Sequence, residues 1–195
     1  MSHFLELDLP TYDLYETYEK LIEEGKIYTP EIDDGLNYQI CINTTPGNED
    51  DYLLGANSLE YDWSKAETIN GNLFVPKREG ELGEHHFTEL CTQFRGTAFE
   101  DAYNALKSKY TLGRVRIMNS MPKSCLSWHE DTSIRVHYPM KTQLGCFMVI
   151  DEEVKVMPKN TWWETNTLIP HTAVNASYEN RLHLVACILD TVPTV

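Results

Sequence analysis

The chain has 195 residues, of which 42% are hydrophobic, and a formal net charge of −14. A chain of this length and composition predicts one domain over residues 1–195 with a core of its own. The acidic excess argues against binding through a broad basic surface, so we expect neither a nucleic acid nor a membrane as a partner.

The first predicted helix covers residues 12–24, YDLYETYEKLIEE. Thr11 stands where a side chain can cap the start of the helix, and Gly25 stands where helices commonly end. The apolar residues recur at intervals of three and four and form one stripe: Leu14, Tyr18, Leu21 and Ile22.

A second helix is predicted over residues 98–109. Thr97 and Glu100 have the T-x-x-E spacing of a capping box, in which each side chain accepts a hydrogen bond from a backbone N–H at the helix start. The residues expected to face the core are Phe99, Ala102, Tyr103 and Leu106.

The segment between the two helices is mostly strand and loop. YQICIN (38–43) alternates, which predicts a strand with Tyr38, Ile40 and Ile42 on one face. Residues 44–96 are rich in Gly, Asn, Asp and Glu and have no clear periodicity. This half of the chain is expected to contribute to the substrate side of a site, with candidates that otherwise belong to loops: Tyr52, Tyr61, His85 and His86.

After Gly113, short β-branched or aromatic-rich runs follow one another with turns between them. Such a series without intervening helices predicts an antiparallel sandwich or barrel. We therefore expect a mainly β protein, with N-terminal helices as support in residues 1–110 and the β core in residues 111–195. The predicted strands are 114–118, 133–138, 146–150, 154–156, 161–163 and 181–189.

Cysteine usage and the N-terminus predict a cytoplasmic protein with reduced thiols. An odd number of cysteines without a CxxC pair is typical of free thiols. MSHFLELDLPTYD has no basic region followed by an apolar run, and no apolar stretch approaches the roughly 20 residues that cross a bilayer. The cysteines are Cys41, Cys91, Cys125, Cys146 and Cys187, and those in QICIN and VACIL are expected in the core.

The segment SWHEDTSIRVHYP (127–139) concentrates charged and imidazole side chains. If residues 129–131 are extended, side chains alternate, so His129 and Asp131 share a face and Glu130 points away. An imidazole and a carboxylate placed in this way can bind one metal ion, although HxD triplets also arise by chance.

A third ligand for such a metal site is available further along the chain. His171 follows Pro170 at the end of TWWETNTLIP, 42 residues after His129 (171 − 129). Two histidines and one carboxylate form the facial triad that leaves positions open on Fe(II) in non-haem oxygenases. A lone histidine after a strand is more often a surface or core residue, so both interpretations stay open.

Arginine and histidine recur at alternate positions on two predicted strands. Arg135 and His137 share one face of SIRVHY, which either faces water or lines a polar pocket. Arg181 begins RLHLVACIL and lies either in solvent or, pointing inward, beside a partner, because an unpaired buried charge is costly. A carboxylate suits its planar guanidinium. His183 shares a face with Arg181 and is a weaker candidate for the pocket.

Three segments together resemble the aspartyl/asparaginyl β-hydroxylase-like branch of the Fe(II)/2-oxoglutarate-dependent dioxygenases. They are LGRVRIMNSMPKSCLSWHEDTSIRVHYPM, GCFMVI and TWWETNTLIPHTAVNASYENRLHLVACIL, roughly residues 112–190. The combined pattern HxD…RxH…PH-x9-R, read with its flanks, is quite specific. Residues 1–110 carry little that matches.

The resemblance implies a double-stranded β-helix, a distorted jelly roll of the cupin kind, supported by N-terminal helices. It implies 2-oxoglutarate as a cosubstrate and O2 as the oxidant. Arg181 would bind the 5-carboxylate of 2-oxoglutarate, and Arg135 and His137 would contact its 1-carboxylate. The implied Fe(II) ligands are His129, Asp131 and His171.

Two positions depart from the animal members of the family that hydroxylate Asp or Asn in secreted domains. Those members have a glycine at the position of Asp131, whereas bacterial relatives acting on free amino acids keep the complete triad. Related halogenases lack the carboxylate to make room for chloride, so Asp131 favours hydroxylation. A serine that helps to bind 2-oxoglutarate in the animal enzymes falls on Met118. The expected substrate is an amino acid or a peptide or protein side chain.

Two further residue types are weaker candidates around the site. Asn175 either orders the surroundings of His171 or belongs to a turn. Trp162 and Trp163 point to opposite faces of a strand, so at most one of them, with Trp163 as the candidate, lines the pocket. Core packing is the default interpretation for both.

Three classes of function fit the sequence. The leading one is an oxygenase that hydroxylates an unactivated C–H bond and converts 2-oxoglutarate and O2 to succinate and CO2. A cupin-type metalloenzyme that does not use 2-oxoglutarate needs no carboxylate-binding arginine ten residues after the last histidine, so Arg181 argues against it. A non-catalytic β-barrel binding module needs no complete set of metal ligands.

Overall fold

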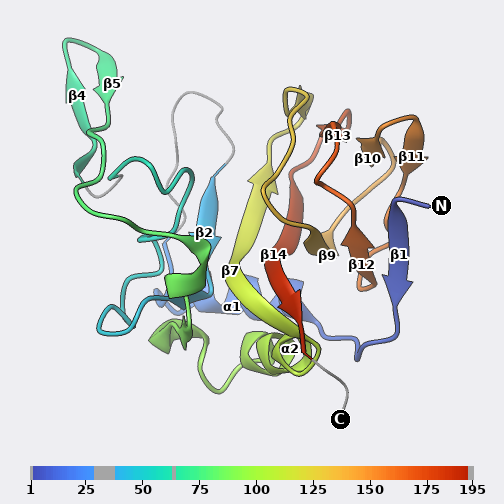
Figure 1. The fold of residues 1–195 in the computed structure, drawn as a ribbon, viewed down its shortest axis with the longest axis horizontal. Coiled ribbons are helices and arrows are strands. Elements are labelled where there is room, and N and C mark those ends of the chain that lie inside the picture. Colours follow the sequence, from blue (N-terminus) through green and yellow to red (C-terminus); the bar gives the residue numbers. More distant parts are fainter. Residues whose placement is uncertain (1, 29–37, 63–64, 193–195) are drawn as a thin grey trace.

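Two antiparallel sheets hold most of the strands in the structure (Figure 1). The computed structural model describes residues 2–28, 38–62 and 65–192. The strand order is β1-β12-β9-β14-β7-β2 in the larger sheet and β11-β10-β13-β8 in the smaller sheet. The larger sheet consists of β1 (Phe4–Leu7), β2 (Gln39–Cys41), β7 (Tyr110–Ser120), β9 (Arg135–Lys141), β12 (Trp162–Thr165) and β14 (Arg181–Thr191). The smaller sheet consists of β8 (Ser124–Cys125), β10 (Cys146–Ile150), β11 (Glu153–Lys155) and β13 (His171–Asn175).

The remaining described elements are helices and short strand pairs. The helices α1 and α2 lie together at the bottom of the view in Figure 1, and the pair β4–β5 projects from the upper left. These elements are α1 (Leu14–Glu23), α2 (Ala98–Lys107), β3 (Asn43–Thr44), β4 (Glu67–Ile69), β5 (Asn72–Phe74), β6 (Glu89–Leu90) and the 3-10 turns η2 (Glu84–His86) and η3 (Thr92–Phe94).

Side-chain alternation gives the larger sheet one apolar and one polar face. On β7, Val115 and Ile117 are fully buried in the main core, whereas Arg116 and Met118 line a cavity on the opposite face. The apolar face packs against both helices, and burial of each large aliphatic side chain contributes about 1.5–3 kcal/mol. The helices contribute Leu14, Tyr18, Leu21, Phe99, Ala102, Tyr103 and Leu106 to this core.

The helix predicted over residues 12–24 is confirmed as α1, but its cap differs from the expected one. The Asp13 carboxylate accepts a hydrogen bond of 3.2 Å from a backbone N–H in the first turn. Thr11 is exposed and lies two residues too early to reach that N–H. Ile22 is 37% exposed, so the buried stripe is narrower than expected. Gly25 has a φ of +67°, the left-handed conformation in which helices often end.

The second predicted helix is confirmed as α2, with Thr97 as its cap. The Thr97 hydroxyl accepts a hydrogen bond of 3.2 Å from the N–H of Phe99. The Glu100 carboxylate accepts from the N–H of Gly96 at 2.6 Å rather than from that of Thr97. The capping box therefore closes one residue earlier than the sequence spacing indicates.

Most predicted strands are confirmed, with shifted ends. The strand 146–150 is identical to β10, whereas β7 and β14 extend to 11 residues each. The strand β13 was not predicted, because HTAVN reads as the turn after a proline. The first 110 residues contain strands β1 to β6 as well as the two helices, so the expected helical N-terminal half is not confirmed.

The cysteines and the hydropathy of the helices agree with two of the expectations. All five cysteines lie in the described residues and are free, and Cys41 and Cys187 are buried as predicted. Only Cys125 is exposed among them. No helix in the described part of the chain has the length and apolar character needed to cross a membrane.

We expect the cap of α1 to depend on Asp13 and not on Thr11. Asp13→Ala removes the acceptor of a helix-terminal N–H and should lower the free energy of unfolding by about 1 kcal/mol. Thr11→Ala is the matched control and should change it by less than about 0.5 kcal/mol. Urea unfolding of both variants measures the difference, and equal effects would contradict the assignment of the cap.

Candidate metal centre

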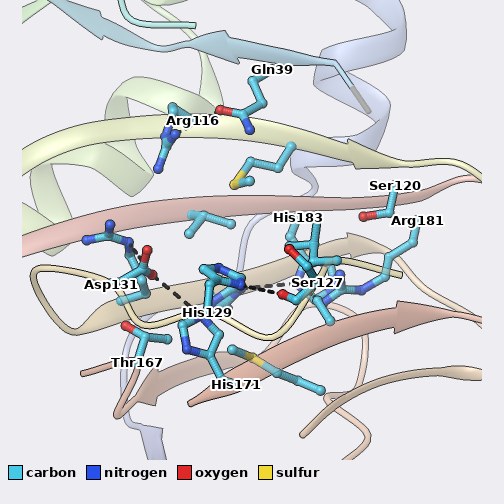
Figure 2. A pocket seen from close by; sticks show the side chains of 17 residues that line it. Gln39, Arg116, Ser120, Ser127, His129, Asp131, Thr167, His171, Arg181 and His183 are labelled. Carbon is cyan, nitrogen blue, oxygen red and sulfur yellow. Dashed lines mark hydrogen bonds and ion pairs between the residues drawn. The ribbon is translucent and has the colours of Figure 1, made fainter. Parts of the chain in front are cut away.

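A cavity of about 330 Å³ lies between the two sheets (Figure 2). Its walls come from β7, β9 and β14 of the larger sheet, from β10 and β13 of the smaller sheet, and from residues 126–131. Its polar lining residues are Gln39, Arg116, Ser120, Ser127, His129, Asp131, Arg135, His137, Thr167, His171, Arg181 and His183. Its apolar lining residues are Met118, Leu126, Met148, Ala173 and Val185.

His129 and His171 are held side by side by their own backbones. The N–H of His129 donates to the carbonyl of His171 at 3.2 Å, and the N–H of His171 donates to the carbonyl of His129 at 2.9 Å. Residues that exchange both hydrogen bonds in an antiparallel pair present their side chains on the same face. The two ring centroids are therefore only 4.2 Å apart.

Backbone carbonyls fix the tautomer of both rings. Nδ1 of His129 lies 2.7 Å from the carbonyl oxygen of Ser127, and Nδ1 of His171 lies 3.0 Å from that of Ile169. A carbonyl only accepts, so Nδ1 carries a proton, and in the neutral ring Nε2 is then the atom with the free lone pair. Burial lowers the pKa of His171, which favours this neutral form.

Asp131 completes the cluster and Glu130 does not, as predicted. The N–H of Asp131 donates to the carbonyl of Thr167 at 2.8 Å, which holds this segment beside β13. Its Oδ2 atom lies 3.7 Å from Nε2 of His171 and 3.2 Å from Nε of Arg135. Glu130 is exposed.

The three side chains fit a single divalent metal ion. One donor atom from each of His129, Asp131 and His171 lies within 4.8 Å of the other two. Two neutral imidazoles with free Nε2 atoms and one carboxylate are the donor set of the facial triad that suits Fe(II). The hydrogen bonds at both Nδ1 atoms orient the rings in the way typical of metal-binding histidines.

Arg181 lines the end of the cavity away from these ligands. Arg181 pairs with Ser120 of β7, and the Nδ2 atom of Asn175 donates to the carbonyl of Ser120 at 2.9 Å. His171 lies four residues from Asn175 along β13, at the other end of the strand. In Figure 2, Asp131 and Arg181 likewise lie on opposite sides of the view, with His129 between them.

The guanidinium of Arg181 is buried without a carboxylate partner among the described residues. Arg181 is 5% exposed and donates to Nδ1 of His183 at 3.2 Å. Burial lowers the pKa of Arg181 to about 10. His183 accepts this hydrogen bond, so its ring is neutral, and burial and Arg181 hold its pKa well below the usual range.

Arg135 and His137 share the inner face of β9, as predicted. The Arg135 guanidinium contacts Asp131 through Nε and donates to the hydroxyl of Ser133 through Nη1. The His137 ring meets that of His183 edge to face, with centroids 5.7 Å apart. Their expected contact with the 1-carboxylate of 2-oxoglutarate stays a prediction.

Sequence reasoning did not single out five polar residues of the cavity: Gln39, Arg116, Ser120, Ser127 and Thr167. Arg116 has the same strand parity as Met118, which the family resemblance places at the site. The alternation of RVRIM was therefore a signal that could have identified it. Gln39 belongs to no motif, because it reaches the cavity only through the pairing of β2 with β7.

Two weaker candidates lie away from the metal ligands. Asn175 is fully buried, and its side chain binds the carbonyls of Ser120 and Glu179 and the hydroxyl of Ser177. It thus fixes a turn and the end of β13, and it has no hydrogen bond to His171. Trp163 packs in a small apolar cluster and does not line the cavity, in agreement with the default of core packing.

The candidates from the N-terminal half do not line this cavity either. The hydroxyl of Tyr52 accepts a hydrogen bond from the N–H of Tyr28 at 2.8 Å, and Tyr61 forms an isolated bridge with Lys77. His85 and His86 belong to the short turn η2 and border a separate, open hollow. Their position agrees with the expectation that they lie in a loop.

Comparison with known proteins gives a family and a fold. A family model described as aspartyl/asparaginyl beta-hydroxylase matches residues 63–190. Among solved structures, an oxidoreductase of the 2OG-Fe(II) oxygenase family from Burkholderia pseudomallei is 12% identical, with 95% of this chain and 83% of that chain covered and a TM-score of 0.50. This likeness concerns the fold alone, and it agrees with the expected jelly roll.

Two further structures are less similar. The collagen prolyl hydroxylase of Paramecium bursaria chlorella virus-1, in complex with 2OG, is 10% identical over 99% of this chain and 97% of its own, with a TM-score of 0.46. A cupin domain from Bordetella pertussis is 16% identical over 40% of this chain and 82% of its own, with a TM-score of 0.36. No curated protein matches the sequence.

The buried histidines predict a loss of stability at low pH. In the unfolded chain His183 gains a proton near pH 6.5, whereas in the folded metal-free protein it stays neutral to a much lower pH. The unfolded state then binds more protons, so the free energy of unfolding falls as the pH drops below about 6.5. His183→Gln should make this fall shallower by up to about 1.4 kcal/mol per pH unit.

Urea unfolding of the metal-free protein between pH 7.5 and pH 5 measures this slope. The control is His85→Gln, which changes an exposed histidine outside the cavity, and its slope is compared with that of His183→Gln. An identical slope in His183→Gln and in the wild type would contradict the buried, neutral state of His183.

Proposed function

Because the chain belongs to the aspartyl/asparaginyl β-hydroxylase family, we propose that it is an Fe(II)- and 2-oxoglutarate-dependent oxygenase. The proposed reaction hydroxylates a C–H bond of an amino acid or of a peptide or protein side chain. One oxygen atom of O2 enters the new hydroxyl group, and the other enters succinate as 2-oxoglutarate loses CO2. The two-electron oxidations of the C–H bond and of 2-oxoglutarate together balance the four-electron reduction of O2.

The observation that carries this proposal is the unpaired Arg181 in the cavity that also contains the metal ligands. A buried guanidinium without a counter-charge is costly, so the site is incomplete without an anion. A planar guanidinium binds a carboxylate through two parallel hydrogen bonds. A metalloenzyme that does not use a carboxylate cosubstrate has no need of this residue.

Fe(II) held by His129, Asp131 and His171 would supply the activation of O2 and two further positions for chelation of 2-oxoglutarate. The role of the protein is to fix these three donors. The carbonyls of Ser127 and Ile169 hold the rings through Nδ1. Arg135 contacts the carboxylate of Asp131, which helps to hold that carboxylate beside His171.

The far end of the cavity would hold the 5-carboxylate of 2-oxoglutarate. Arg181 supplies the charge there, and His183 fixes the direction of its guanidinium through the hydrogen bond of 3.2 Å. Ser120 lies on the same face of β7 as Met118, directly opposite Arg181. Its hydroxyl is therefore placed to replace the serine that the family resemblance locates at position 118.

The apolar part of the lining would keep water from the reacting groups. Met118 and Val185 come from the larger sheet, and Met148 and Ala173 come from the smaller sheet. These side chains line the same cavity as Arg181 and the metal ligands. Excluding water strengthens the electrostatic interactions inside the site and limits side reactions of the activated oxidant.

The metal ligands can be tested without turnover. Under argon, Fe(II) and 2-oxoglutarate together should give a weak visible metal-to-ligand charge-transfer band and should raise the melting temperature. His129→Ala should abolish both effects, whereas Glu130→Ala, which changes the exposed neighbour, should preserve them. A wild-type protein that binds Fe(II) but shows neither effect would overturn the proposed use of 2-oxoglutarate.

The role of Arg181 predicts a selective loss. Arg181→Gln should weaken the binding of 2-oxoglutarate by about 30- to 4,000-fold, because it removes one partner of a buried charge pair worth roughly 2–5 kcal/mol. The affinity for Fe(II) alone should change by less than about threefold. Anaerobic titrations followed by the charge-transfer band measure both, and an equal loss of the two affinities would show that the role of Arg181 is structural.

A further inference from the structure

A second buried guanidinium of the cavity, that of Arg116, contacts no carboxylate among the described residues. Arg116 is 7% exposed and its Nε atom has no hydrogen-bond partner. It donates to Oε1 of Gln39 at 2.8 Å and has only a long contact of 3.8 Å with Sγ of Cys187. The role proposed for Fe(II) and 2-oxoglutarate makes no use of this residue.

Two neighbouring arginines each contact a carboxylate, in contrast to Arg116. Arg114, two residues earlier on β7, contacts Glu84 with two nitrogen atoms, at 3.1 and 2.8 Å, and donates to two backbone carbonyls. Arg135 contacts Asp131. Arg116 also lines the cavity but, unlike both of these arginines, it contacts no carboxylate.

The strand register places Arg116 at the metal end of the cavity. Val185 of β14 pairs with Arg116 on one side and with His137 on the other. Neighbouring strands are about 4.8 Å apart, so the Cα atoms of Arg116 and His137 are about 10 Å apart across the inner face. In Figure 2 the Arg116 side chain points toward the part of the cavity that contains Asp131.

The same register separates Arg116 from the expected position of the 5-carboxylate. Ser120, which pairs with Arg181, lies four residues further along β7, a distance of about 13 Å along the strand. On the facing sheet, Asn175 contacts Ser120 at the Arg181 end of the cavity, and His171 lies four residues away from Asn175 along β13. The metal ligands and Arg116 therefore share one end of the cavity, and Arg181 has the other.

We propose that Arg116 and Gln39 form a subsite for a carboxylate of the substrate. This inference rests on the proposed function, since it takes Arg181 as the partner of 2-oxoglutarate. Gln39 fixes the guanidinium by accepting from Nη1, and its amide N–H groups are free to donate to the same anion. A carboxylate bound there completes the hydrogen bonds of Arg116 and holds the carbon to be hydroxylated near the metal ligands.

The chemistry of the cavity favours an acid over its amide or a neutral molecule. A buried cation gains most from a ligand that carries the opposite charge, because solvent does not screen the pair. Asp131, the one acidic group among the described lining residues, is already shared between His171 and Arg135. The carboxylate comes from a free amino acid or from an acidic residue of a peptide, and the test separates these sources.

The test measures binding to the Fe(II)- and 2-oxoglutarate-loaded protein under argon, where no turnover occurs. The probes are the common L-amino acids, each paired with its carboxamide, and short peptides that contain Asp or Glu, each paired with the Asn or Gln peptide. We expect the acids of one set, either the free amino acids or the acidic peptides, to raise the melting temperature. We expect their amides to have no effect. Stabilisation by free amino acids identifies a free amino acid as the source of the carboxylate, and stabilisation by acidic peptides identifies an acidic residue of a peptide.

Variants of Arg116 assign this selectivity to the subsite. Arg116→Gln should weaken the binding of the acid by about 30-fold or more and should leave the affinity for 2-oxoglutarate within about threefold of the wild type. Arg116→Lys keeps the charge and should recover part of the affinity. Gln39→Leu, which leaves the arginine in place, should give a smaller loss of the same selectivity and keeps the test valid if Arg116→Gln fails to fold.

Two results would overturn the inference. One is equal binding of acids and amides, or no binding of any acid in either set. The other is a loss of 2-oxoglutarate affinity in Arg116→Gln as large as that in Arg181→Gln, which would assign Arg116 to the cosubstrate. The charge-transfer band is recorded in the same samples. Its absence from the wild type would refute the proposed function, while acid-selective binding lost in Arg116→Gln would still support the carboxylate subsite.

Discussion

The alternation of side chains along β7, β9 and β14 is the constraint on which both the core and the cavity depend. In each strand, one parity is apolar and packs against α1 and α2, and the other parity carries arginine or histidine toward the smaller sheet. A shift of one residue in the pairing would bury the cations against the helices and expose the aliphatic residues to the cavity. The register is therefore specified by the same residues that form the site.

The smaller sheet contributes little to the core and much to the geometry of the site. The two backbone hydrogen bonds between His129 and His171 add one antiparallel pair of residues beside this sheet, and they set the distance between the two rings. The side chain of Asn175 fixes the opposite end of β13 to β7. A strand tied at both ends places its histidine reproducibly, which a metal site requires because its donors must converge within a few tenths of an ångström.

Strand parity made much of the site predictable from sequence, and it failed where long-range pairing decides. The pairs His129 with Asp131 and Arg181 with His183 follow from alternation, and the structure brings all four to one cavity. Gln39 could not be identified, because only the pairing of β2 with β7 brings it to the site. The cap of α1 was misassigned to Thr11, since spacing alone does not show which side chain reaches the free N–H groups.

The charges of the cavity agree with the two anionic ligands that are proposed for it. Arg116, Arg135 and Arg181 carry three positive charges against the single negative charge of Asp131, which leaves +2 while the histidines are neutral. A divalent metal ion raises this to +4, and 2-oxoglutarate with its two carboxylates lowers it to +2. A substrate carboxylate lowers it to +1 and pairs with the guanidinium of Arg116. By this count the cavity carries a net charge of +2 both before the metal and the cosubstrate bind and after both are bound, so it attracts a substrate carboxylate in the fully loaded state as well.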